Sequence, residues 1–198
     1  MINQNTKLDG DELMHLAMQA MQTNSNEQAI DYLKRLLEIS DDNGKAYYLL
    51  GAVHAQIGMY ERAAVEMAKA VELDSDLPTA HFQLGLLHIT SGRVEEAEQA
   101  WQALDKLGES DPLFHFKCGM LHLVNDEFDA CIEDLNQGIA LNNLNEALNN
   151  DMRKIINGAE QARDKPMSPS VPDQEQGGND GGRHILLSAY QRDDETEH

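Results

Sequence analysis

Apolar and polar positions follow a helical period along most of the chain. The stretch from residue 145 to about 163 is a simple case, because Leu148, Met152, Ile155 and Ile156 are apolar and polar residues separate them. Apolar residues three or four positions apart lie on one face of a helix. Abundant Ala, Leu, Glu, Gln and Met, with only 5% aromatic residues, also favour helix over strand. The pattern therefore predicts an all-α fold.

The pattern repeats at a fixed interval. Gly51, Gly85 and Gly119 are 34 residues apart, and Ala17 precedes Gly51 by the same interval. Twelve residues further on lies a second series of small residues, each followed four residues later by a large apolar one. The small residues are Ala29, Ala63, Ala97 and Cys131, and the large ones are Leu33, Met67, Trp101 and Leu135. Small residues let paired helices approach closely while large ones fill the gaps. The predicted repeats span about residues 10–43, 44–77, 78–111 and 112–145.

This spacing resembles the tetratricopeptide repeat family, whose unit is a helix-turn-helix with small residues at its eighth and twentieth positions. The second repeat matches that motif best. Its matching residues are Tyr47, Leu50, Gly51, Gly58, Tyr60, Ala63 and Ala70. The resemblance implies a right-handed solenoid of stacked helix pairs, which serves to bind other proteins.

Beyond the repeats we expect a capping helix at residues 146–163, so the predicted domain spans 10–163 after an N-terminal extension at 1–9. Residues 164–183 contain three of the five prolines and four glycines, which predicts a disordered linker. Residues 184–198 begin with an apolar segment and end with acidic residues. The apolar residues of this tail motif are Ile185, Leu186, Leu187 and Tyr190. We predict that the motif either binds the chain's own repeats, where it occludes their partner-binding groove until a better ligand displaces it, or binds another protein.

Charge and hydropathy narrow the class of partner. The chain has 35 acidic and 15 basic residues and a formal net charge of -20, which disfavours phosphate backbones and anionic lipid. Its first residues include acids and Gln where a secretory signal has a basic start, and no run of about 18 apolar residues occurs. We therefore expect a cytoplasmic protein that neither binds nucleic acid nor inserts into a membrane.

Histidines give the best candidate for chemistry. His54, His88 and His122 recur at the repeat interval, but equivalent positions in stacked repeats are on the order of 10 Å apart. Zinc holds imidazole nitrogen at about 2.0–2.1 Å, so we interpret these residues as substitutes for tyrosine between helices. An enzyme or metal protein that uses them is the competing class. Cys118 and Cys131 show no zinc or disulfide spacing, and we expect no enzyme, metal or cofactor.

The resemblance also implies a peptide-binding groove, lined by the first helix of each repeat. Nearly every residue at the corresponding positions is apolar. These residues are Met14, Met18, Met21, Tyr48, Ala52, Ala55, Phe82, Leu86, Ile89, Phe116, Met120 and Leu123. The core-facing side of the same helices is apolar too, and a helix with two apolar faces must bury both. We predict that an apolar or amphipathic segment of a partner covers this face; a wide core under the capping helix is the alternative.

The groove positions also indicate the kind of partner. Repeats of this family that hold the acidic C-terminus of heat-shock chaperones use a clamp of Lys, Arg and Asn. This sequence has Met14, Met18, Leu49, Thr79 and Gln83 there, so we expect no such partner. Methionine makes a deformable wall, which favours an adaptor or chaperone. As an alternative, size, acidity and repeat count resemble type III secretion chaperones for hydrophobic translocator proteins, although the long C-terminal tail departs from them.

Overall fold

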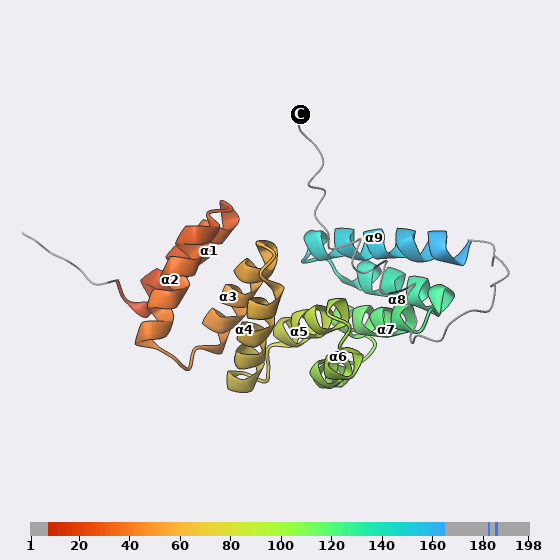
Figure 1. The fold of residues 1–198 in the computed structure, drawn as a ribbon, viewed down its shortest axis with the longest axis horizontal. Coiled ribbons are helices and arrows are strands. Elements are labelled where there is room, and N and C mark those ends of the chain that lie inside the picture. The colour runs from red at the N-terminus through yellow and green to blue at the C-terminus, as the bar shows by residue number, and fades with distance from the viewer. Residues whose placement is uncertain (1–7, 165–181, 183–184, 186–198) are drawn as a thin grey trace, which may run out of the picture. The chain divides into compact units, whose positions relative to one another are not determined.

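The computed structural model describes residues 8–164, Gly182 and Ile185 (Figure 1). Residues 8–164 form nine α-helices and one short 3-10 helix, and none of the described residues lies in a strand. The predicted all-α class is therefore confirmed. No helix among the described residues combines the length and the apolar character needed to cross a membrane.

The helices follow one another in pairs. They are α1 (Gly10–Gln22) with α2 (Asn26–Ile39), α3 (Gly44–Gln56) with α4 (Tyr60–Leu73), α5 (Pro78–Thr90) with α6 (Val94–Trp101), α7 (Pro112–Val124) with α8 (Phe128–Leu141), and finally α9 (Glu146–Arg163). The 3-10 helix η1 (Gln102–Leu107) continues the shorter α6. First helices begin at residues 10, 44, 78, 112 and 146, so α9 has the register of a first helix in a fifth repeat.

A left-handed residue joins the two helices of every repeat. These residues are Asn24 (φ 55°), Gly58 (φ 80°), Gly92 (φ 74°) and Asp126 (φ 56°). Asn and Asp tolerate positive φ better than other non-glycine residues, so the first repeat turns without a glycine. The N–H of Ser25 then donates to the carbonyl of Ala20 at 2.8 Å, which closes the helix end as in a Schellman motif.

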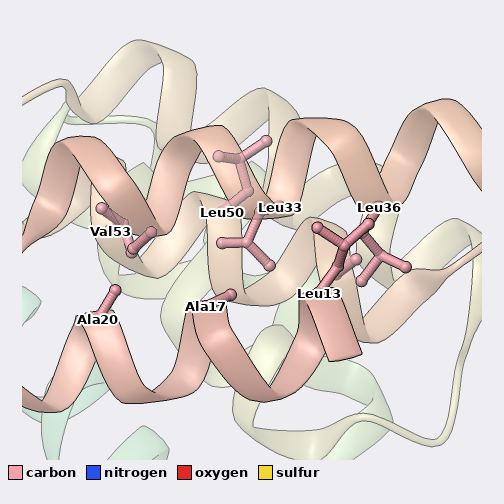
Figure 2. Close-up of a cluster of buried hydrophobic side chains, with 9 residues drawn as sticks. Leu13, Ala17, Ala20, Leu33, Leu36, Leu50 and Val53 are labelled. Atoms are coloured by element: carbon pink, nitrogen blue, oxygen red, sulfur yellow. The ribbon is translucent and has the colours of Figure 1, made fainter. Parts of the chain in front are cut away.

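The chain divides into two compact units. One holds the described residues up to His88 together with Glu95–Ala103, and the other holds Ile89–Val94 and the described residues from Leu104 onward. In the first unit, α1, α2 and α3 share one core. Figure 2 labels Leu13, Ala17, Ala20, Leu33, Leu36, Leu50 and Val53 in this core. A second cluster joins α4 to α5 through Met67, Ala80 and Leu84.

Within a repeat, the small residue of the first helix lies under the large residue of the second. A Cβ added to Gly51 would lie 3.1 Å from Met67 Cγ, and one added to Gly119 would lie 2.6 Å from Leu135 Cδ2. At Gly85 an added Cβ would overlap the indole of Trp101. These contacts explain the 34-residue series of small side chains, because a larger residue would force the two helices apart.

In the second unit, α9 packs on α8, at the residues where the sequence predicts a capping helix. Its apolar stripe, Leu148, Met152, Ile155 and Ile156, is buried. A polar joint holds its first turn: Asn142 Nδ2 donates to Asn149 Oδ1 at 2.8 Å, and Asn149 Nδ2 donates to the carbonyl of Asn142 at 2.9 Å. Both amides are buried, so this joint fixes where α9 begins relative to the end of α8.

Candidate protein-binding surfaces

The first two repeats present apolar side chains that are only partly covered. Met14, Met18 and Met21 lie on one face of α1, because their spacing is one helical turn. Met14 and Met21 pack against the core that α1 shares with α3. Met18 between them is 40% exposed. The flexible thioether side chain of Met18 is therefore open to solvent, next to two methionines that pack against the core.

The first helix of the second repeat continues the same pattern. Tyr48, Ala52 and Ala55 on α3 are half-buried and pack against the cluster formed by α4 and α5. We call the six residues of the first two repeats the N-terminal apolar face. Its members are Met14, Met18, Met21, Tyr48, Ala52 and Ala55. All six belong to the first compact unit.

The six candidate residues of the third and fourth repeats are part of the core. Phe82, Leu86, Ile89, Phe116, Met120 and Leu123 are at most 3% exposed. Phe82 stacks on Trp101 with ring centroids 6.1 Å apart. Phe116 packs on Gly138 of α8, where an added Cβ would collide with the ring. The structure thus separates the twelve candidates into a partly open group and a buried group.

Two described residues of the C-terminal region contact the second unit. Gly182 donates its N–H to Oδ1 of Asp126 at 3.0 Å and lies against the carbonyl of Leu123. Ile185 is 8% exposed and lies against Gly158 of α9. The other members of the tail motif, Leu186, Leu187 and Tyr190, lie outside the described residues, as does most of the predicted linker.

Two of the histidines that recur at the repeat interval, His54 and His122, contact carboxylates of their own repeat. Buried His54 places Nδ1 2.5 Å from Glu66 Oε2, and His122 Nε2 lies 3.4 Å from Asp134. In both repeats the acid follows the histidine by twelve residues, so an acid at this distance is the sequence signal for the pair. Among the described residues, no group of three or more His, Cys, Asp or Glu side chains is arranged to hold a metal ion.

The two thiols are not placed for nucleophilic chemistry. Burial, followed by the nearby charge of Asp134, raises the pKa of the Cys131 thiol to about 12. Burial also raises the pKa of Cys118, and Asp134 adds to the effect. Because the thiolate is the reactive form of cysteine, both side chains act as small apolar groups near neutral pH.

Helix pairs in a constant register, with small residues under large ones and a left-handed residue at each turn, define a helical-repeat protein of the helix-turn-helix type. The family described as tetratricopeptide repeat matches residues 15–78. Residues 15–78 are therefore assigned to tetratricopeptide repeats, and the helices after residue 78 keep the interval of the matched part. No curated protein matches the sequence.

Solved structures show the same fold. MamA protein is 18% identical over 92% of this chain and 88% of its own, with a TM-score of 0.58. A MamA fragment from Desulfovibrio magneticus RS-1, from residue 41 to the end, is 14% identical over 94% and 97%, with a TM-score of 0.60. YrrB, described as a tetratricopeptide repeat protein with an unusual peptide-binding site, is 17% identical over 92% and 84%, with a TM-score of 0.57. At such low sequence identity, these similarities show a shared fold.

Proposed function

We propose that this protein is a non-enzymatic adaptor or chaperone, and that its N-terminal apolar face binds an apolar or amphipathic segment of a partner protein. One observation carries the proposal: Met18 is 40% exposed, between Met14 and Met21, on a helix whose adjacent face, formed by Leu13, Ala17 and Ala20, is already part of the core. Apolar side chains gathered on one open face are typical of a protein interaction site. YrrB, which shares the fold, is described as having a peptide-binding site.

The composition of this face indicates what it binds. Methionine side chains are flexible and polarisable, so they adapt to different apolar surfaces. Tyr48 on α3 adds an aromatic ring with a polar end, which is favoured at protein interfaces. The formal net charge of -20 speeds association with partners that carry basic residues. The best-fitting partner is thus an apolar segment flanked by basic residues.

The experiment compares two single charges on neighbouring exposed positions of α1. Full-length protein, Met18→Glu and Gln19→Glu are used to capture partners from the source cell, and captured proteins are identified and quantified. Both substitutions add one carboxylate to an exposed position, but only Met18 belongs to the N-terminal apolar face. We expect Met18→Glu to lose the partner, because a charge then lies where an apolar side chain must dock, and Gln19→Glu to retain it.

Circular dichroism and thermal unfolding show that the variants are folded before capture is compared. Equal capture by the two variants would contradict the proposal and move the site to another surface. The narrower role of a chaperone has its own readout. A chaperone keeps an isolated apolar partner segment soluble at a stoichiometric ratio, and Met18→Glu should remove that protection, whereas an adaptor leaves aggregation of the segment unchanged.

A further inference from the structure

Two contacts join residues far apart in the sequence at the end of the second unit. Asp126, the left-handed residue between α7 and α8, accepts the N–H of Gly182 at 3.0 Å. The same glycine lies so close to Leu123 that a Cβ would overlap the Leu123 carbonyl. Only a residue without a side chain therefore fits at position 182. The Asp126 carboxylate and the Leu123 carbonyl both contact Gly182, so this position requires glycine.

The second contact requires another glycine. Ile185 is 8% exposed and lies on α9, where a Cβ added to Gly158 would be 2.5 Å from Ile185 Cγ2. Glycine within a helix lowers its stability, so a glycine at this position of α9 needs a reason. The hollow that Gly158 leaves for the isoleucine side chain supplies it.

The first two repeats show one contact at the equivalent place. Asn24 is the left-handed turn residue of the first repeat, and its Oδ1 accepts the side-chain N–H of Gln56 on the next first helix at 3.1 Å. Asp126 and Gly158 lie three repeat intervals after Asn24 and Gln56. Gly158 has no side chain to donate, and the N–H of Gly182 takes the role of the missing amide. The C-terminal residues thus replace a contact between repeats.

We propose that Leu123, Asp126 and Gly158 form a docking site for a Gly-x-x-Ile segment, and that the chain's own Gly182 and Ile185 occupy it in cis. The turn carboxylate binds the segment's backbone, the Leu123 carbonyl selects glycine, and the hollow at Gly158 receives isoleucine. We call these three residues the tail site. It shares no residue with the N-terminal apolar face, so the two proposals are tested independently.

The length of the chain permits docking in cis. Seventeen residues separate Asp164 from Gly182, and such a chain spans at most about 60 Å when fully extended. Gly158 is less than two helical turns from the end of α9, so the required distance is far shorter. A short tether gives an effective concentration on the order of millimolar, at which a weak four-residue contact is occupied.

The first test uses hydrogen exchange on the full chain. Gly158→Ala places a methyl group against Ile185, whereas Asn157→Ala introduces the same residue at an exposed neighbouring position of the same helix. Alanine favours helix over either residue, so both variants should fold. We expect amides of residues 182–185 to be slowed in the wild type and in Asn157→Ala, and to lose this protection in Gly158→Ala. Unchanged protection in Gly158→Ala, or no protection in the wild type, would overturn the proposal.

The second test uses a fluorescent peptide of residues 181–190 and measures its binding by polarisation. If the tail site is filled in cis, full-length Ile185→Asp binds the peptide more tightly than the wild type, by on the order of tenfold for a contact with a dissociation constant near 0.1 mM. The same peptide carrying Ile185→Asp should not bind. Equal binding to both proteins, or none to either, counts against the site.

Light scattering distinguishes the remaining occupant, a second copy of the chain. A monomeric wild type supports docking in cis. A dimer that Ile185→Asp converts to monomer would overturn it, because the segment would then fill the site of a neighbouring copy. Neither result depends on capture by the N-terminal apolar face, so failure of the tail site leaves that proposal intact.

Discussion

The indole of Trp101 lies directly over Gly85, and its Nε1–H donates to the carbonyl of Phe82 at 3.0 Å. The hydrogen bond holds the ring in place, and the stacked ring of Phe82 covers part of one side. The same contact recurs in the second repeat between Met67 and Gly51, but there the upper residue is flexible. Trp101 is therefore held in one position more firmly than Met67 is.

This difference predicts unequal costs for the same substitution. Gly85→Ala should lower the free energy of unfolding by about 1–3 kcal/mol, because the added methyl group must displace a hydrogen-bonded indole. Gly51→Ala is the control: an added Cβ meets Met67 Cγ at 3.1 Å, and a gain in helix propensity of up to about 1 kcal/mol offsets the strain. Urea denaturation measures both. Equal midpoints for the two variants would show that the Trp101 ring moves freely.

The His54–Glu66 pair gives a second stability prediction. His54 is buried and its Nδ1 lies 2.5 Å from Glu66 Oε2, so Glu66→Ala leaves a buried ring nitrogen without its partner. We expect a loss of about 1–3 kcal/mol. Glu72→Ala, on the same helix, removes only an exposed pair with Lys69 and should cost less than about 0.5 kcal/mol. If thermal unfolding gives both variants a similar loss of stability, the His54–Glu66 contact contributes no more than an exposed ion pair.

Local patterns predicted the helices and their pairing, because helical period and small-residue spacing depend on a few neighbouring positions. The same signal predicted a helix after residue 145, and the apolar stripe of α9 from Leu148 to Ile156 is buried. The acid twelve residues after His54 was also visible in the sequence, but its meaning required knowing that the two helices of a repeat are antiparallel neighbours.

The accessible surface was harder to predict than the fold. Phe82 and Phe116 occupy positions that face a groove in the family. In this chain Phe82 stacks on Trp101, and the ring of Phe116 packs against Gly138 of α8. These contacts depend on how particular side chains pack, and the periodicity of the sequence does not predict that packing. The contact between Asp126 and Gly182 joins residues 56 positions apart. In the sequence Gly182 falls within the predicted linker, and no pattern singles out Gly158.

The polar joint between α8 and α9 leads to a third prediction. Asn149→Ala removes two buried hydrogen bonds with Asn142 and leaves at least one polar group unsatisfied, at a cost of about 1–3 kcal/mol. Asn150→Ala changes the same residue type at the next, exposed position and should be nearly neutral. Hydrogen exchange should locate the loss at α9. Exchange that rises uniformly along the chain would instead mean that α9 does not open as a separate segment.

The thiols give a prediction about pH. Burial raises the pKa of Cys131 from an ordinary value of 9.0 to about 12, so the folded protein keeps this thiol protonated where an unfolded chain ionises it. The resulting stability is fully present below about pH 9 and is lost as the pH rises from 9 towards 12. At pH 8 a thiol reagent should label Cys118 slowly and Cys131 only after denaturation in urea, since Cys118 is half-buried and Cys131 is buried. Mass spectrometry of labelled peptides assigns each site.

Cys131→Ser serves as the control, because the native protein should then give the same labelling as the parent. Rapid labelling of Cys131 in the folded parent would show that α8 opens away from its neighbours on the timescale of the reaction.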